Sequence, residues 1–514
     1  MADLQAYFAQ RGVPFEPGLV RRKRGGVCHV FYEPTLPGFR ALPDSAPIRK
    51  LFGSVDPDGF LAGRKPVGDS LDVIKRVLRA LPRPIDVTLS LTRELGVESW
   101  DRAIAAHFPQ TEHSIRLRAS AAAETHPWAQ DYVKSGEVAG KAVVLTPRRL
   151  YEGRTLEGER FRPLVDALHE EGFVASKLSW EGGDLQVAAD PRDPDRRILF
   201  FGAAVRRYWG DSLSAEEFGY VLRVELGADE AVDLSDVGFH ADFVASFLSD
   251  GKTALVAQPI LGSRALARDA AAELALRFKG RAPAELVALV ETLGRAEDWR
   301  RQDAERIRGL VGKLDRALRL VPPQVSAEVG QSLEAHVARR CPGRPADCFS
   351  GEAKARLYRE DPKLLQMGLN VLADAEMDSK LASAMLGLIE GQLPDAPDHW
   401  GPKLDAKAER LAALGFRVIR TPYLPPGGPE RAWAGVSYVN ALAFDNLVFL
   451  PRLGLGKSED ALFQALQSGL GDAYEVVPVQ ARFGLLHNGG IHCVFGIERA
   501  ESIPASTRIS NLSY

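Results

Sequence analysis

The sequence predicts an α/β protein built from several copies of one strand–helix module and interrupted by a helical segment. Two observations indicate this fold class. Through most of the chain, short extended stretches alternate with amphipathic stretches of about ten residues. One long interval in the second half carries only the helical pattern. The alternation recurs without obvious sequence identity between the copies, so we expect a repeated module.

The first predicted element is a helix at residues 70–81. Leu71, Ile74 and Leu78 recur there at helical spacing, and Pro82 ends the helix. The same criteria predict helices at residues 99–107 and 161–171. Extended segments accompany these helices at residues 84–91, 114–119, 172–178, 197–201, 220–224 and 253–258.

The last part of the chain returns to the alternating pattern. Helices are predicted at residues 405–414 and 459–466. Strands are predicted at residues 416–420 and 475–479, with a strand pair within residues 441–450. This order of elements matches that of the first part, so we assign it to the same kind of module.

The interval at residues 262–400 differs because it is almost wholly helical. One apolar stripe consists of Ile307, Leu310, Val311, Leu314 and Leu318, and another of Leu381, Met385, Leu388 and Ile389. Such stripes are far more often core than ligand site. We therefore divide the chain into a Pro- and Gly-rich N-terminal leader at residues 1–66, modules at 67–261, a helical insertion at 262–400 and further modules at 401–514.

Composition and charge narrow the classes of function. The chain has 514 residues, with 65 basic and 68 acidic residues and a formal net charge of -3. This balance gives no global field for nucleic acid or anionic lipid, so we expect neither as a partner. No apolar run approaches the ~20 residues of a membrane span, and four cysteines cannot make a disulfide scaffold in a chain of this length. We therefore expect a cytoplasmic protein.

Five short polar segments fall between the predicted strands, where α/β proteins usually expose their functional groups. They lie at residues 126–131, 180–185, 238–242, 437–440 and 488–493. Each is weak by itself, because a lone cysteine near glycines is usually a small buried hydrophobe and a Gly-Gly pair is usually a turn.

Together the segments supply the parts for nucleophilic displacement at a cationic planar carbon. Cysteine is nucleophilic once ionised, and a neighbouring cation lowers its pKa, so Cys493 is the candidate nucleophile. A guanidinium presents five N–H donors and needs carboxylate acceptors, which Asp131 and Asp242 could provide. His240 is suited to proton transfer near neutral pH, and Glu181 could orient it and raise its pKa.

Four motifs carry a resemblance to a known superfamily. They are Trp128 to Asp131, Glu181 to Asp184, His240 to Asp242 and Gly490 to Cys493. In this order, with the cysteine last, they resemble the guanidino-group-modifying superfamily, which has the pentein fold. Within it they resemble agmatine deiminases and the catalytic domain of protein-arginine deiminases. The resemblance covers residues 67–499, interrupted by the helical interval.

The resemblance implies a fold and a set of roles. The fold is a pseudo-fivefold α/β propeller of ββαβ modules with the active site at its central axis. The nucleophile is Cys493, and the general acid and base is His240. Asp131 and Asp242 bind the guanidinium, and Glu181 pairs with the histidine. Trp128 belongs to the substrate-binding motif.

The chain departs from both families near the first aspartate. Agmatine deiminases usually carry Arg before this aspartate and Gly-Pro after it, whereas here Gln130 precedes Asp131 and no Gly-Pro follows. Calcium-dependent protein-arginine deiminases place acidic ligands where this chain has Lys134 and Gln186. This departure argues against activation by calcium, so we expect no cofactor.

The leading hypothesis is a hydrolase that converts the guanidinium of arginine, agmatine or an arginine-bearing protein to a ureido group and releases ammonia through a thiouronium intermediate on Cys493. An amidinotransferase would use the same side chains and pass the amidino group to an amine. A catalytically silent arginine-binding protein is a third hypothesis. A metal enzyme, with ligands from His240, Asp242, His492 and Cys493, is disfavoured because no Cys-x-x-Cys or His-x-x-x-His spacing accompanies them.

Overall fold

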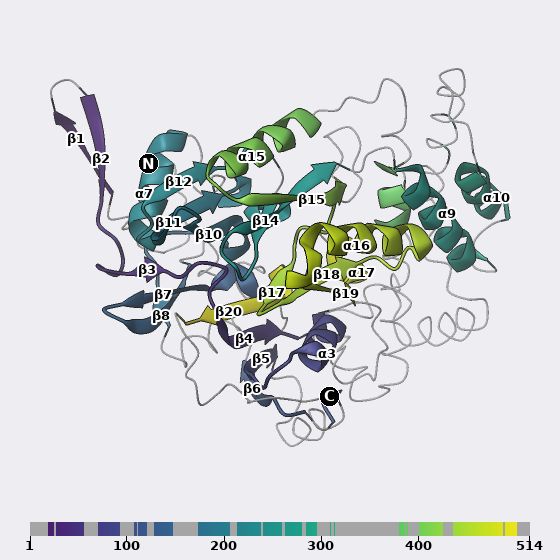
Figure 1. Ribbon diagram of the computed structural model, residues 1–514, viewed down its shortest axis with the longest axis horizontal. Helices are drawn as coiled ribbons and strands as arrows, with labels where there is room; N and C mark the ends of the chain where they lie inside the picture. Colours follow the sequence, from purple (N-terminus) through teal and green to yellow (C-terminus); the bar gives the residue numbers. More distant parts are fainter. Residues whose placement is uncertain are drawn as a thin grey trace, which may run out of the picture.

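The computed structural model describes a mixed α/β architecture in which helices flank several small sheets (Figure 1). Six sheets occur in the part of the chain that the structure describes. This part comprises residues 19–24, 27–55, 70–92, 107–109, 111–120, 128–147, 173–205, 213–237, 240–259, 263–279, 284–295, 309, 313, 380–385, 387–388, 400–424, 435–486 and 489–500.

Five of these sheets share one strand plan, in which an antiparallel pair is followed by a strand parallel to its second member. In the order first strand, second strand and parallel strand, they are β7 (Lys134–Val138), β8 (Lys141–Thr146) and β9 (Val174–Ala175); β10 (Leu185–Asp190), β11 (Asp193–Phe201) and β12 (Glu230–Asp233); β13 (Ala245–Phe247), β14 (Thr253–Pro259) and β15 (Arg417–Leu424); β17 (Leu442–Phe444), β18 (Leu447–Arg452) and β19 (Glu475–Gln480); β20 (Phe495–Arg499), β4 (Ile48–Ser54) and β5 (Asp86–Thr92).

Short edge strands extend three of these sheets. β3 (Arg40–Ala41) pairs with β7, β16 (Val436–Ser437) with β15, and β6 (Ser114–Ser120) with β5. The sixth sheet is the hairpin of β1 (Leu19–Arg24) and β2 (Val27–Tyr32), which projects from the body of the molecule in Figure 1.

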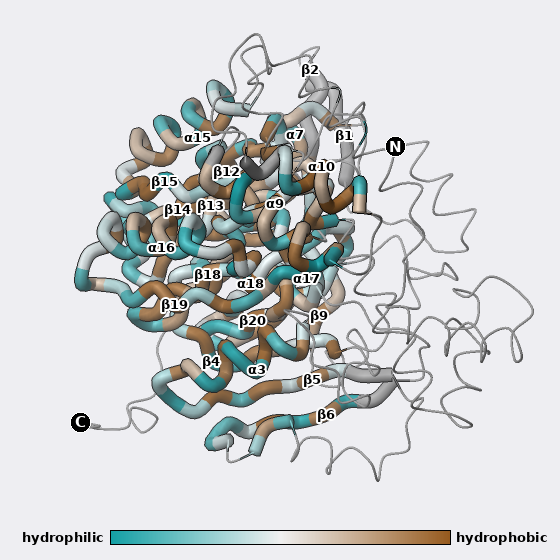
Figure 2. Tube along the Cα trace, turned by 90° about the vertical axis from the view of Figure 1, so that its right-hand side faces the viewer, coloured by the Kyte–Doolittle hydropathy of each residue, from teal (hydrophilic) through white to brown (hydrophobic). Residues whose placement is uncertain are grey.

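A helix joins the second strand to the parallel strand in four of the five sheets, as a parallel crossover requires. The helices are α3 (Ser70–Ala80), α7 (Ala215–Leu226), α15 (Gly401–Ala413) and α16 (Gly456–Leu470). Each helix buries one apolar face; Leu71, Ile74 and Val77 of α3 are at most 2% exposed. Figure 2 shows the corresponding alternation of hydrophobic and hydrophilic residues along the chain.

Most of the predicted elements that lie in the described residues are present, within a few residues at either end. The prediction of a strand at residues 220–224 is wrong, because these residues belong to α7. Ser214 and Glu217 form a reciprocal capping box at the start of this helix, and Gly227 ends it in the left-handed conformation with φ 60°. These end signals prevail over the β-branched residues inside. The helix predicted at 161–171 and the stripe at 307–318 lie essentially outside the described residues, as does most of 99–107.

The expectation of a separate N-terminal leader needs correction. β4 lies between β20 and β5, so residues near the start of the chain complete a sheet whose first strand is the last element described. Leu51 and Phe52 are fully buried there. Part of the segment at residues 1–66 therefore belongs to the core of the fold.

The helical interval lies in the connection between β14 and β15, which pair in parallel from Thr253 opposite Arg417. Its described part includes α9 (Arg264–Phe278), α10 (Ala284–Arg295) and a helical segment at residues 380–385. α9 packs on α16, where the Asp269 carboxylate accepts the Ser458 N–H at 2.9 Å. No described helix has the length and apolar character needed to cross a membrane.

Candidate active site

Four of the five sheets carry a single helical turn directly before their first strand, and these turns hold the polar motifs. They are η2 (Ala129–Tyr132) before β7, η3 (Gly182–Asp184) before β10, α8 (Ala241–Val244) before β13 and α18 (Ile491–Val494) before β20. The residues flanking each turn are mostly extended, so each turn is a kink in an otherwise extended chain. η2 contacts both η3 and α18, and η3 contacts α8. The fold therefore gathers motifs that lie far apart in sequence.

Glycines allow two of these turns to pack at backbone distance. A Cβ atom at Gly182 would lie 2.1 Å from the carbonyl oxygen of Gln130, so η3 can approach η2 only without a side chain at this position. A Cβ atom at Gly183 would lie 3.0 Å from Asp242 Oδ2, 3.1 Å from Asp131 Oδ1 and 3.1 Å from His240 Nδ1. Two carboxylates and an imidazole thus face one point above Gly183.

His240 is held by an acidic partner. Its Nε2 lies 2.5 Å from Glu181 Oε2, and its side chain is 4% exposed. Burial by itself lowers the pKa of His240, but the charges of Glu181, Asp131 and Asp184 outweigh that effect and raise the pKa to about 10. The ring is therefore an imidazolium at neutral pH, able to give a proton.

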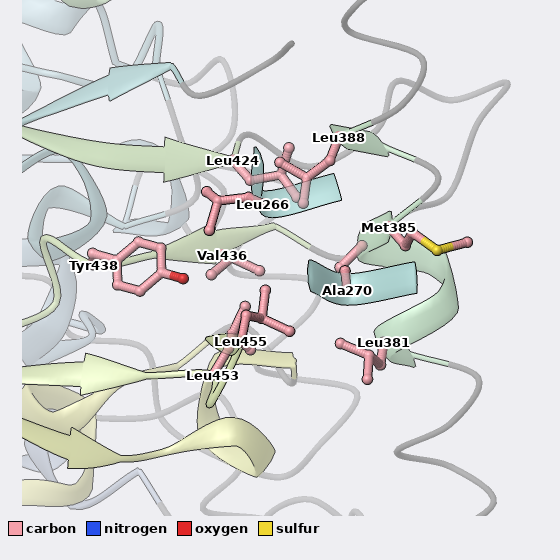
Figure 3. Close-up of a pocket in the computed structure, with 11 residues that line it drawn as sticks. Leu266, Ala270, Leu381, Met385, Leu388, Leu424, Val436, Tyr438, Leu453 and Leu455 are labelled. Carbon is pink, nitrogen blue, oxygen red and sulfur yellow. The ribbon is translucent and has the colours of Figure 1, made fainter. Parts of the chain in front are cut away.

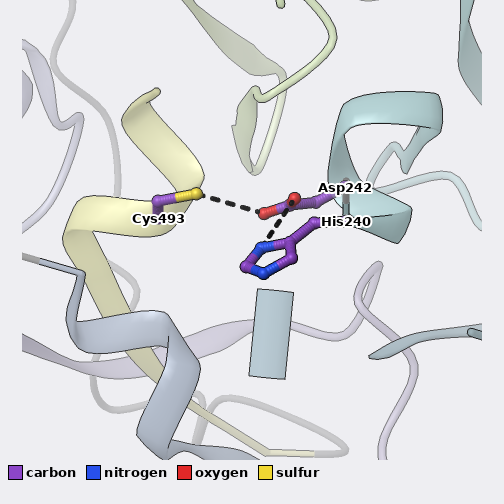
Figure 4. A group of neighbouring side chains, drawn as sticks. All are labelled: His240, Asp242 and Cys493. Carbon is purple, nitrogen blue, oxygen red and sulfur yellow. Dashed lines mark hydrogen bonds and ion pairs between the residues drawn. The ribbon is translucent and has the colours of Figure 1, made fainter. Parts of the chain in front are cut away.

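Asp242 lies between the imidazole and the thiol (Figure 4). The Cys493 thiol donates to Asp242 Oδ2 at 3.4 Å, and His492 Nδ1 lies 2.9 Å from the same oxygen. Asp242 Oδ1 lies 3.9 Å from His240 Nδ1 and has no hydrogen-bond partner among the described residues. A fully buried carboxylate with a vacant acceptor position calls for a hydrogen-bond donor from a ligand or water.

Cys493 is buried, and its pKa is raised well above the ordinary value. Burial is the main cause, and the negative charges of Asp242 and Asp131 add to it. The resting site therefore holds a thiol. A cation that neutralises these carboxylates would lower the pKa of the thiol and produce the nucleophile.

Asp184 belongs to the second motif, and its carboxylate hydrogen-bonds to the backbone near the site. Its carboxylate accepts the N–H groups of Val205 at 2.5 Å and Ala241 at 2.9 Å, and it is fully buried. Burial raises the pKa of Asp184, while His240 and the two N–H donors oppose this rise. Because Ala241 begins α8, Asp184 fixes the turn that carries His240 and Asp242.

Two groups of side chains have the ligand types of a metal site: His240, Asp242 and Cys493 in one, and Asp131, Glu181 and His240 in the other. In each group the ligand atoms lie within 4.8 Å of one another. Both groups include His240, whose pKa of about 10 leaves no lone pair on either nitrogen at neutral pH. The carboxylates of both groups are also acceptors for the N–H donors of an organic cation.

Lys134 and Gln186 are the two residues on which the expectation of no calcium activation rests. The Lys134 ammonium lies 3.2 Å from Asp44 Oδ1 and donates to the carbonyl oxygen of Leu185 at 2.6 Å. Gln186 is 1% exposed. A protein cation therefore links the strand after η2 to the strand after η3.

Trp128 lies beside the loop that leads to Cys493. A Cβ atom at Gly489 would lie 2.3 Å from the Trp128 indole, and one at Gly484 would lie 3.5 Å from it. The indole therefore packs against Gly484 of α17 (Arg482–Leu486) and against Gly489, just before the turn that carries Cys493. Its assignment to substrate binding stays a prediction.

A small apolar pocket lies elsewhere, between α9, the end of β15 and the start of α16 (Figure 3). Leu381, Met385 and Leu388 of the predicted stripe line it, together with Leu266, Ala270, Ala384, Leu424, Val436, Tyr438, Leu453 and Leu455. These side chains are core residues of the helical interval and its support, as expected for an apolar stripe.

Three further residues at the site were not among the predicted catalytic and substrate-binding residues. Asn440 donates to Cys493 Sγ at 3.1 Å, His492 shares Asp242, and Gly183 allows both acids and His240 to approach its backbone. The position of Asn440 in the sequence could have indicated a role, because this residue falls in the fourth polar segment and lies two residues before a strand.

Comparisons with known proteins complete the description. The sequence matches no protein-family model and no curated protein. Among solved structures, the chain is similar to the agmatine deiminase of C. jejuni, with TM-score 0.49 and 12% identity over 90% of this chain and 96% of that chain. An agmatine deiminase of Enterococcus faecalis follows, with TM-score 0.45 and 12% identity over 91% and 98%.

A dimethylarginine dimethylaminohydrolase is also similar, with TM-score 0.32 and 9% identity over 88% of this chain and 99% of that chain.

Proposed function

We propose that this protein is a guanidine deiminase, which hydrolyses a guanidinium to a ureido group and ammonia through a covalent intermediate on Cys493. One observation carries the proposal: the Asp131 and Asp242 carboxylates and the His240 imidazolium face one point above Gly183, and the Cys493 sulfur lies within 4.8 Å of ligand atoms of His240 and Asp242. Small guanidines such as arginine or agmatine, and peptidyl arginine, are the candidate substrates.

The charges favour a planar cation in that space. The three carboxylates of Asp131, Glu181 and Asp242 outnumber the single positive charge of His240, so a bound guanidinium would offset part of the excess negative charge. Its N–H fork needs acceptors in one plane, and two carboxylates that face one point supply them. The vacant Asp242 Oδ1 fits this acceptor role.

The chemistry then follows from the two titrating groups. The bound cation lowers the pKa of Cys493, whose proton passes to solvent, and the thiolate forms a C–S bond to the guanidino carbon as the C–N π bond opens. His240 gives its proton to the departing nitrogen, the C–N bond breaks, and ammonia leaves a thiouronium on Cys493. Neutral His240 next takes a proton from water, whose oxygen attacks the same carbon. The C=O bond forms as the C–S bond breaks, the hydroxyl proton restores the Cys493 thiol, and the ureido product is released.

We further propose that the five sheets form a pseudo-fivefold propeller around this site, with the helical interval at residues 262–400 as an insertion. The support is the shared strand plan and the equivalent place of each motif-bearing turn. The carboxylates and the nucleophile would then come from different modules of one repeat.

The direct test is an assay of arginine, agmatine and an arginine-containing peptide for ammonia and ureido product. Release of both without an added amine supports the deiminase. Product formation only when an acceptor amine is added would identify an amidinotransferase, and guanidine binding without turnover a silent binding protein. Either result would overturn the proposal.

Gly183→Ala should abolish turnover although the backbone tolerates alanine there. The added methyl group would lie 3.0–3.1 Å from both carboxylates and from His240, in the space assigned to the guanidinium. We expect kcat/KM to fall by at least ~10²-fold, the scale of misplacing reacting groups. Gly469→Ala is the control, since its Cβ atom would be 3.7 Å from the nearest side chain. Normal turnover by folded Gly183→Ala would place the substrate elsewhere.

Glu181→Gln should move the alkaline limb of the pH profile to lower pH. Removing this carboxylate lowers the pKa of His240 from about 10, so the proton donor is lost earlier as pH rises. The raised pKa also stabilises the native protein: this contribution is present below the ordinary value of 6.5 and is lost as pH rises through about 10. Turnover and Tm measured against pH should both show the shift, and superimposable profiles would contradict it.

A further inference from the structure

The fifth sheet also has a polar residue directly before its first strand. Asn440 precedes β17 by two residues, much as Asp131, Asp242 and Cys493 precede the first strands of their own sheets. It is fully buried. The proposed reaction gives this residue no role, although its position in the repeated module is that of the other site residues.

Three groups of Asn440 form hydrogen bonds with the segment that carries Cys493. Its Nδ2 donates to Cys493 Sγ at 3.1 Å, and its Oδ1 accepts the backbone N–H of Cys493 at 3.2 Å. Its backbone carbonyl accepts the N–H groups of Ile491 at 3.2 Å and His492 at 3.4 Å. The side chain of Asn440 thus contacts Cys493 alone among these residues, while its backbone carbonyl binds the start of α18.

The chain around Cys493 is shaped for this contact. A Cβ atom at Gly490 would lie 2.6 Å from Asn440 Oδ1, so the carboxamide reaches Cys493 only because residue 490 has no side chain. The carboxamide is also oriented unambiguously. Its oxygen must face the Cys493 N–H donor, which leaves its NH2 group toward the sulfur.

We propose that Asn440 is a catalytic residue that stabilises the Cys493 thiolate by donating a hydrogen bond to its sulfur, an inference that rests on the proposed deiminase function. Asp242 and Asn440 act on the sulfur in opposite senses. Asp242 accepts the thiol proton and favours the neutral form, whereas an amide N–H donor favours the anion.

The two contacts together make the thiol respond to its substrate. When a guanidinium N–H binds Asp242, its positive charge offsets the carboxylate that opposes ionisation of the thiol, while the Asn440 N–H remains in place to stabilise the thiolate. The Asn440 hydrogen bond lowers the pKa of Cys493, against the burial and carboxylates that raise it. Ionisation is thereby confined to the occupied site.

The test uses Asn440→Ala and the nearly isosteric Asn440→Asp in the full chain. The pH dependence of Cys493 alkylation by iodoacetamide is followed by peptide mass spectrometry, which separates Cys493 from Cys28, Cys341 and Cys348. We expect the midpoint to rise in Asn440→Ala and to rise further in Asn440→Asp, where a carboxylate faces the sulfur. kcat should fall by about 10²-fold with KM changed less than about threefold, as for loss of one donor to a developing anion.

Ser246→Ala is the matched control. Its hydroxyl donates to the carbonyl oxygen of Val439 at 2.7 Å, so it supports the same segment without touching the thiol. Its alkylation midpoint should equal that of the wild type. An unchanged midpoint in Asn440→Asp, or an equal shift in Ser246→Ala, would overturn the proposal. Because alkylation needs no substrate, it tests the effect of Asn440 on the thiol even if no guanidine is hydrolysed. Absence of hydrolysis would contradict only the proposed deiminase function.

Discussion

Purified Cys493→Ser protein should release no ammonia from any guanidine that the wild-type protein hydrolyses. A serine hydroxyl ionises far less readily than a thiol, and the carboxylates that surround residue 493 oppose any anion there. His240 is an imidazolium, so no base stands ready to remove the hydroxyl proton. We expect the loss in kcat to reach at least ~10⁴-fold, as when other enzymes lose their nucleophile.

The measurement is ammonia release at saturating guanidine, with guanidine binding followed by calorimetry. Binding should persist, because the acceptors for the guanidinium are carboxylates and not the sulfur. A variant that carries serine at Cys28, Cys341 and Cys348 is the control and should retain activity. Near-normal turnover by Cys493→Ser would exclude covalent catalysis through this residue.

Asp242→Asn should separate the reactivity of the thiol from the binding of substrate. The amide retains the size of the side chain but removes a charge and an acceptor, which should cost about 3 kcal/mol of guanidine binding or transition-state stabilisation. This equals about two powers of ten in kcat/KM. The same change removes a charge that raises the pKa of Cys493, so alkylation of the thiol at neutral pH should become faster.

Lower kcat/KM together with faster alkylation is diagnostic, because simple damage to the site would slow both reactions. Asp131→Asn should likewise weaken guanidine binding, since its carboxylate faces the same point above Gly183. Asp472→Asn, an exposed acid on η7 (Gly471–Ala473), is the control for loss of one negative charge. Unchanged guanidine affinity in both site variants would show that the guanidinium is held elsewhere.

The periodicity of the sequence was sufficient to identify most helices and strands. Apolar spacing located α3, α15 and α16, and short β-branched runs located β5, β14 and β19. It failed at α7, because runs such as Tyr220–Val224 are compatible with either state and only the capping residues at both ends decide. Periodicity is also silent on pairing, so the union of β4 with β20, at opposite ends of the chain, could not be foreseen.

The candidate site divides in the same way. Chemistry by itself singled out Cys493, His240, Asp242, Asp131 and Glu181, because a thiol, an imidazole and several acids are what a guanidinium reaction needs. Residue chemistry could not give the distances between these side chains. Asn440 and Gly183 lay in the polar segments but were given no role, since an amide before a strand and a glycine in a turn have many structural uses.

The sequence by itself determined the α/β character, the repeated order of elements and the kinds of side chain available for chemistry. Only the tertiary structure decided that these side chains meet. The reason is physical: local spacing sets the period of each helix and strand, whereas contacts among the segments before β7, β10, β13, β17 and β20 depend on long-range pairing. The tertiary structure also set the charge states, because burial and neighbouring carboxylates, rather than residue type, make Cys493 a resting thiol and His240 an imidazolium.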